Sequence, residues 1–372
     1  AAALLQSTAS PVAFPTETVY GLAADATNPD AVAGIYAAKQ RPADNPLIVH
    51  FADLTQLRSF LREGTAGTPA ADPASDPIPA IYRPLLPRFW PGPLTILLPL
   101  PPDSPLAPAV TAGQPTFAAR IPSSPLARAL IAATGRPLAA PSANASTRPS
   151  PTTAAHVLAD LNGRIAAVLD GGPCGVGVES TVVDGLSSPP AVLRPGGVGI
   201  GELRKVPGWE VTVVGYRDGE EGAGGKEVYK PRAPGMKYRH YAPRARVVLF
   251  EAPARTLSRI DLGGCARLGV IRTARWEALG DEAGEEMTNE ADEEVDAAEP
   301  RCRMMTVEER GVEIWDVHLG PDAADVGRGL FGALRALDGC GVEVILVEGI
   351  EDGAGDVAAA VMNRLRKAAE VR

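Results

Sequence analysis

The chain has few of the residues that build disulfide scaffolds or metal sites. Its 372 residues include only four cysteines and four histidines, with no Cys-x-x-Cys pair and no His-Glu-x-x-His motif. These absences exclude a disulfide scaffold, a cysteine-rich zinc module and a helical zinc hydrolase, and the sparse cysteines fit a reducing compartment. No apolar run reaches the roughly 18 residues of a membrane-spanning helix.

A targeting signal is also missing from the start of the chain. Residues 1–5 are apolar but include neither an initiator methionine nor a basic segment. We therefore expect them to be the interior of a helix in a trimmed chain rather than a signal peptide. The natural N-terminus, and any organelle signal with it, is expected to lie upstream.

Charge divides the chain into two parts. The net charge is −9, yet residues 1–207 contain 14 basic and 14 acidic residues, so the remainder carries the whole imbalance. Within it, residues 281–299 hold ten acidic residues and no basic one, a composition typical of a solvated loop. Neither part has the broad basic surface of a nucleic-acid-binding protein.

Length and composition predict two domains joined by a linker. Proline is abundant, at 36 of 372 residues. The Gly/Pro-rich segment 64–79 is interpreted as a surface insertion, and 217–235 as the best linker candidate. We expect a catalytic domain at 1–207, a linker or lid at 208–245, and a C-terminal domain at 246–372 that contains the acidic insertion.

Short apolar runs predict the sheets. In the first half we expect strands at 12–14, 46–50, 94–98, 116–120, 166–169 and 180–183, and a helix at 30–40. This pattern favours an α/β (α+β) fold with a twisted mixed sheet, flanking helices and a central cleft. In the second half, strands at 245–250, 268–271 and 342–347 alternate with helices at 324–337 and 357–369, which indicates a smaller Rossmann-like α/β domain.

Cations lie where several of these elements end. Arg120 and Arg194 each end a strand, and Lys39 and Arg41 follow a helix. Each could be an ordinary solvated cation, but four that converge at one edge of a sheet suit a polyanion such as a nucleoside triphosphate. The segment Gly222–Glu227 resembles a phosphate-binding loop only superficially, because it lacks the first glycine and the Ser/Thr of that motif.

Small polar residues accompany these cations. Ser142, Asn144, Thr152 and Ser180 either cap local turns or orient a polar ligand, and both roles remain open. His50 ends a predicted strand and is either a satisfied core histidine or a site residue.

Several ordered strings resemble one family. The front half resembles the YrdC-type domain of L-threonylcarbamoyladenylate synthases, and a string near its end resembles the linker of the long, two-domain form. The strings are Phe14–Leu22, Lys39–Leu47, Phe89–Thr95, Pro141–Asn144, Ser150–Thr152, Gly177–Asp184, Leu193–Gly196 and Pro234–Pro243. The resemblance is strong over residues 4–245.

The resemblance implies a nucleotidyltransferase that makes threonylcarbamoyl-AMP and pyrophosphate from L-threonine, bicarbonate and ATP. The product serves threonylcarbamoyladenosine modification of ANN-decoding tRNAs, and a separate complex performs the transfer. Mg²⁺ is expected to accompany ATP without an assigned protein ligand. The implied location is the cytoplasm, with a mitochondrial pool as an alternative.

The resemblance also implies the site residues. The L-threonine site is expected to contain Thr18, His50, Arg120, Ser142 and Ser180. The ATP site is expected to contain Lys39, Arg41, Asn45, Thr116, Asn144, Thr152, Arg194 and, from the lid, Tyr241. Of these, Lys39, Arg41 and Arg120 are the expected catalytic residues. Departures from the family pattern, such as Gln40 and Ile121, remove no polar ligand.

Two rival functions are weaker. A double-stranded RNA-binding module would need a basic face, which the neutral front half does not supply. A carbamoyl-transfer enzyme of the hydrogenase-maturation type would need a zinc-finger module, which the cysteine spacing does not supply.

Overall fold

The computed structural model describes residues 1–42, 44–65, 75–216, 240–251, 265–276, 312–353 and 355–370, and the backbone of the strand 303–307. The chain forms two compact units, which we describe separately. Unit 1 comprises Ala1–Ser146, Pro151–Gly175 and Glu179–Tyr238; unit 2 comprises Thr147–Ser150, Val176–Val178 and Arg239–Arg372. Much of the expected linker (217–239), the acidic segment 281–299 and residues 66–74 of the expected insertion lie outside the described residues.

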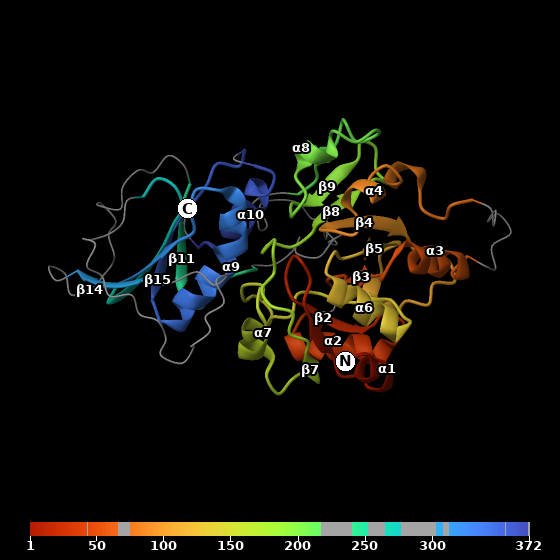
Figure 1. Ribbon diagram of the computed structural model, residues 1–372, viewed down its shortest axis with the longest axis horizontal. Helices are drawn as coiled ribbons and strands as arrows, with labels where there is room; N and C mark the ends of the chain where they lie inside the picture. The colour runs from red at the N-terminus through yellow and green to blue at the C-terminus, as the bar shows by residue number, and fades with distance from the viewer. Residues whose placement is uncertain are drawn as a thin grey trace, which may run out of the picture. The chain divides into compact units, whose positions relative to one another are not determined.

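Unit 1 is built on one mixed sheet, as predicted (Figure 1). Its strand order is β10-β9-β8-β4-β5-β3-β6-β2-β1-β7. The pairs β3–β5, β4–β8, β9–β10 and β1–β7 are parallel, and the remaining neighbours are antiparallel. The strands are β1 (Val12–Phe14), β2 (Gly21–Asp25), β3 (Ile48–His50), β4 (Leu94–Pro99), β5 (Thr116–Arg120), β6 (Leu138–Ala139), β7 (Ala167–Val168), β8 (Thr181–Asp184), β9 (Ala191–Arg194) and β10 (Val213–Val214).

Helices flank this sheet, and local sequence explains where the longer ones begin and end. Before α2, the Asn28 side chain accepts from two backbone N–H groups, and at its end Gln40 turns left-handed at φ 53°. Ser124 caps α6 in the same way, and Gly135 ends it at φ 69°. The helical segments are α1 (Ala2–Ser7), α2 (Pro29–Lys39), α3 (Leu54–Glu63), η1 (Ala80–Tyr82), α4 (Leu86–Phe89), α5 (Pro108–Thr111), α6 (Pro125–Thr134), α7 (Ala154–Leu161) and α8 (Ile200–Leu203).

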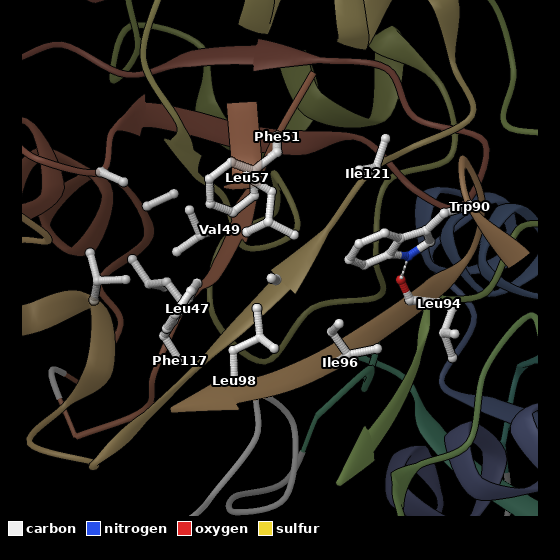
Figure 2. Packing of buried hydrophobic residues seen from close by; sticks show 14 of the residues in the cluster. Leu47, Val49, Phe51, Leu57, Trp90, Leu94, Ile96, Leu98, Phe117 and Ile121 are labelled. Atoms are coloured by element: carbon white, nitrogen blue, oxygen red, sulfur yellow. Dashed lines mark hydrogen bonds between the residues drawn. The ribbon is translucent and has the colours of Figure 1, made fainter. Parts of the chain in front are cut away.

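Both faces of the central strands are buried. One face of β4, β3 and β5 contributes Leu94, Ile96, Val49 and Phe117 to the largest core cluster (Figure 2). The opposite face contributes a smaller cluster with Ile48, Leu97, Ala118 and Val182 among its members. Burial on both faces explains why these strands are continuous apolar runs rather than alternating ones. The strands are therefore fixed in place, and the residues at their ends are fixed with them.

The predicted strands and the helix at 30–40 agree with these elements to within two residues at each end. Several elements lie outside the predicted segments, among them β2, β6 and β10. Gly21–Asp25, which has no β-branched residue, forms β2, an inner strand between β6 and β1. Residues 208–216, placed in the expected linker, belong to unit 1 because Trp209 is fully buried and β10 pairs with β9.

Unit 2 contains a five-stranded sheet of order β11-β15-β12-β14-β13, in which only β13 is antiparallel to its neighbour. The helices α9 and α10 pack against one another beside the sheet (Figure 1). This arrangement confirms the smaller α/β domain. Its elements are β11 (Arg246–Phe250), β12 (Arg267–Arg272), β13 (Arg303–Val307), β14 (Val312–His318), α9 (Ala323–Gly339), β15 (Val344–Glu348) and α10 (Ala358–Ala368). Among the described residues, no helix has the length and hydrophobicity needed to cross a bilayer.

Candidate functional site

The loop between β1 and β2 is held by its own threonines. The Thr16 hydroxyl donates to the Val19 carbonyl oxygen at 2.6 Å and lies 2.8 Å from the Thr18 hydroxyl. Because the Thr16 proton is already used, Thr18 donates to Thr16 and keeps its lone pairs as acceptors. The loop is also tied to two distant segments, since Tyr20 N–H donates to Pro151 O and Ala143 N–H donates to Tyr20 O.

Arg120 and His50 end adjacent parallel strands in register. The Arg120 guanidinium donates through Nη2 to Glu17 Oε1 at 2.7 Å and through Nε to Gly92 O at 3.4 Å. His50 is buried, its Nδ1 lies 3.2 Å from Ile48 O, and its ring meets Phe14 edge-on. Burial, with a smaller contribution from Arg120, lowers the pKa of His50 to about 3. The ring is therefore neutral at physiological pH.

Ser180 lies between two polar side chains near the start of β8. Its hydroxyl is 2.8 Å from the Thr95 hydroxyl of β4 and accepts from Arg194 Nη2 at 3.1 Å. Arg194 also donates from Nε and Nη2 to Ser180 O, so one guanidinium fixes both the hydroxyl and the backbone. A Cβ atom on Gly196 would lie 2.3 Å from Glu179 O and from Ser180 C, so only glycine permits this close approach.

Lys39 ends α2 and reaches the turn that follows β6. Its ammonium donates to Ser142 O at 2.5 Å, Asn144 O at 2.6 Å and Asn144 Oδ1 at 3.2 Å. The Ser142 hydroxyl donates to the same Asn144 Oδ1 at 2.6 Å. An ammonium has three protons, and three oxygens face them here. Lys39 therefore shapes the turn that carries two other predicted site residues.

Arg41 and Asn45 lie on the segment that leads into β3. Arg41 Nη2 donates to Asn45 O and Pro46 O at 3.4 and 3.2 Å. Asn45 Oδ1 is buried and accepts no hydrogen bond from a described residue. The parallel register of β3 and β5 places Thr116 opposite this segment. Thr116 is thus at the other end of β5 from Arg120, ~13 Å away at the usual rise per strand residue.

Thr152 precedes α7 and is buried. Its backbone N–H donates to His156 Nδ1 at 3.2 Å, and its hydroxyl lies 3.3 Å from the same nitrogen. His156 Nδ1 therefore acts as an acceptor, with its proton on Nε2. Cys174 N–H donates to Thr152 O, which ties the loop before β8 to this turn.

Tyr241 is the one predicted site residue that belongs to unit 2. Its ring stacks on Phe331 of α9, with centroids 5.4 Å apart, and the guanidinium of Arg364 lies 5.7 Å from the ring centroid. Tyr241 is buried and has a left-handed backbone at φ 67°. Its expected contact with ATP remains a prediction.

Hydrogen bonds and strand register connect most of the predicted residues of unit 1. Strand register joins Arg120 to His50, and hydrogen bonds join Ser180 to Arg194 and to Thr95. Thr95 lies on β4, which pairs with the strand β5 that Arg120 ends, so these residues form one group. A second holds Lys39, Ser142 and Asn144, and a bridge between Gly21 and Ser142 joins it to the loop that carries Thr18. Arg41, Asn45 and Thr116 lie at the opposite end of β5.

Three partners of these residues are not among the predicted site residues. Glu17 pairs with Arg120, Thr95 with Ser180, and His156 with Thr152. Glu17 and Thr95 fall inside the strings that carry the family resemblance, and this position could have marked them as candidate site residues. Their partners are 103 and 85 residues away, a separation that no spacing rule covers.

Two family models match the chain end to end. The model named Sua5_yciO_yrdC, described as "Telomere recombination", matches residues 6–196. The model described as "Threonylcarbamoyl-AMP synthase, C-terminal domain" matches residues 200–370. The fold and site thus define a two-domain protein built on a YrdC-type sheet.

Full-length relatives show to which family within this class the chain is similar. The chain is 46% identical to the threonylcarbamoyl-AMP synthase of Schizosaccharomyces pombe, over 100% of this chain and 88% of that protein. It is 43% identical to the enzyme of that name from Bacillus subtilis, over 99% and 92%. The structure of Pyrococcus abyssi Sua5 complexed with L-threonine aligns with a TM-score of 0.76 and 38% identity, over 99% and 92%. The chain therefore belongs to the threonylcarbamoyl-AMP synthase family, which confirms the resemblance.

Proposed function

We propose that this chain is a nucleotidyltransferase that converts L-threonine, bicarbonate and ATP into threonylcarbamoyl-AMP and pyrophosphate. The observation that carries the proposal is the buried cluster at the ends of β3, β5 and β9 and the start of β8. It combines a guanidinium with an open donor, hydroxyls and a neutral imidazole. Full-length identity to enzymes of that name supports the proposal.

The threonine subsite is proposed around Arg120. Nη1 of Arg120 donates to no described residue, so it is available for a carboxylate. Thr18 offers acceptor lone pairs, and the other predicted threonine ligands are His50, Ser142 and Ser180. A site that hydrogen-bonds the threonine hydroxyl would reject analogues without it, because its buried polar groups would lose their partner.

The ATP subsite is proposed to extend from Asn144 and Arg194 toward the far end of β5. Arg41, Arg194 and Lys39 supply positive charge for the phosphates, while the buried Asn45 Oδ1 can accept from a nucleotide donor. Lys39 can reach a phosphate only by giving up one of its three carbonyl contacts. The full proposed set is Lys39, Arg41, Asn45, Thr116, Asn144, Thr152, Arg194 and Tyr241.

Mg²⁺ is proposed to accompany the triphosphate. Within the described part of the chain, no group of three His, Cys, Asp or Glu side chains gathers to hold a metal ion. The proposal names no protein ligand for this ion, and none of the steps below depends on it.

The proposed reaction has two bond-forming steps. The neutral threonine amine becomes an N-carboxylate, either by attack on CO₂ with loss of one amine proton or by attack on bicarbonate with loss of water. A carboxylate oxygen then attacks the α-phosphorus of ATP, and the bond to the β-phosphate breaks with release of pyrophosphate. No covalent enzyme intermediate is required, so positioning and charge stabilisation carry the catalysis. Arg120 would hold the threonine carboxylate and thereby direct its amine toward the α-phosphate.

The reaction is tested with labelled bicarbonate, L-threonine and ATP. We expect pyrophosphate release that requires both threonine and bicarbonate, together with a labelled mixed anhydride of AMP. Arg120→Ala should lose most of this activity with ATP binding retained. Wild-type protein that forms no labelled anhydride would refute the proposed reaction.

The use of the product after its release is also a proposal. We propose that threonylcarbamoyl-AMP passes to a separate complex that modifies ANN-decoding tRNAs, in the cytoplasm or in a mitochondrial pool. Product transfer to tRNA only after that complex is added would support this division. Salt-sensitive binding of double-stranded RNA by this chain alone would instead favour the RNA-binding alternative.

A further inference from the structure

Glu17 connects the β1–β2 loop to the segment Arg120–Ser123, beside the proposed threonine subsite. Its Oε1 accepts from Arg120 Nη2 at 2.7 Å, and its Oε2 accepts from the backbone N–H of Ser123 at 3.1 Å. The side chains of the ion pair are only 5% (Arg120) and 14% (Glu17) exposed. Water therefore screens this pair poorly, and its geometry is tightly defined.

This bridge fixes the direction of the Arg120 guanidinium. The plane of the group is set by two contacts, Nη2 to Glu17 and Nε to the Gly92 carbonyl oxygen. The third nitrogen, Nη1, donates to no described residue. Because a guanidinium is planar and rigid, fixing two nitrogens also fixes where the third one points.

Two titratable side chains that interact with Arg120 carry no negative charge. His50, its in-register neighbour, is uncharged, and its pKa is lowered to about 3. Cys174 is buried, and burial raises the pKa of its thiol to about 12, so the thiol is uncharged as well. The ion partner of Arg120 is Glu17.

We propose that Glu17 is a positioning residue that aims Arg120 Nη1 at the carboxylate of L-threonine. This inference rests on the proposed function. Each Glu17 oxygen accepts a hydrogen bond from the protein, so the carboxylate is held in place beside Arg120. The opposite role is competition, in which Glu17 occupies the guanidinium that the substrate needs. The two roles predict opposite changes in the KM for threonine.

The first test is steady-state kinetics of Glu17→Ala. We expect the KM for threonine to rise at least about tenfold, the order expected when a charge-assisted hydrogen bond is lost, and the KM for ATP to stay unchanged. Calorimetric titration with L-threonine alone gives the same affinity change without turnover. Glu17→Gln keeps one acceptor for Arg120 but places an amide N–H₂ against Ser123 N–H, so a smaller increase is expected.

A double-mutant cycle with Arg120 separates positioning from a general structural effect. If Glu17 acts through Arg120, then adding Glu17→Ala to an Arg120→Ala protein leaves threonine affinity where Arg120→Ala alone put it. Additive losses would mean that Glu17 acts elsewhere.

The matched control is Asp76→Ala, which removes another carboxylate–arginine pair of unit 1, that with Arg58. It should leave both KM values unchanged. A wild type that forms no threonylcarbamoyl-AMP would refute the proposed function itself. With an active wild type, an unchanged or lowered KM for threonine in both folded Glu17 variants would overturn the positioning role.

Discussion

Acidification from pH 7 to pH 5 is expected to destabilise unit 1 through His50. His50 lies on β3, which pairs with β5 and β6, and its ring is buried against Phe14 and interacts with Arg120. The carbonyls of Ile48 and Leu138 favour a protonated ring, but burial and Arg120 outweigh them and lower the pKa to about 3. The folded protein therefore keeps a neutral ring where the unfolded chain binds a proton.

The sign and size of the effect follow from linkage. A histidine in the unfolded chain has a pKa of about 6.5, so stability from the neutral ring is present above that pH. It is lost progressively as the pH falls toward 3. Between pH 7 and pH 5 the free energy of unfolding should fall by about 2 kcal/mol on account of His50 alone.

The assay compares wild type with His50→Gln by urea denaturation at both pH values. The glutamine amide can still donate to a neighbouring carbonyl, while the other histidines and the carboxylates titrate alike in both proteins. We expect the wild type to lose about 2 kcal/mol more than the variant on acidification. Equal losses would show that the ring is protonated in the folded state and that burial does not control its charge.

Three further changes have defined outcomes. Gly196→Ala should destabilise unit 1 by about 1–3 kcal/mol and weaken threonine binding, because its Cβ would overlap the backbone at Ser180, whereas Gly175→Ala, with open space around it, should do neither. Lys39→Met should cost about 1–3 kcal/mol in urea denaturation by leaving buried carbonyl oxygens without a donor; an unaffected stability would point to a role only at the phosphates. In unit 2, Glu348→Ala removes the acceptor of three backbone N–H groups, so its urea midpoint should fall by more than that of Glu348→Gln.

Local sequence was sufficient for the strands that carry the site. The run Thr116–Arg120 is apolar up to its terminal arginine, and the structure forms β5 over those same residues. Such a strand can be predicted from sequence because burial on both faces makes it a continuous apolar run, whichever strands it pairs with. The position of Arg120 at a strand end, and hence its candidacy for an anion, follows from the same reasoning. The strand β2 was not predicted because Gly21–Asp25 has a weak β propensity. It forms a strand because it pairs with β6 on one side and β1 on the other, and this pairing overrides the propensity.

The apolar strands, the polar residues at their ends and the family strings that contain them can all be identified in the amino-acid sequence. Which of those polar groups meet depends on how the strands and helices pack. Arg120 pairs with Glu17 because β5 ends beside the β1–β2 loop, and Lys39 reaches Ser142 because α2 ends beside the turn after β6. Such contacts join residues about a hundred positions apart, and they depend on sheet order and register. Local propensity and spacing carry no information about either, because both arise from packing of the whole unit.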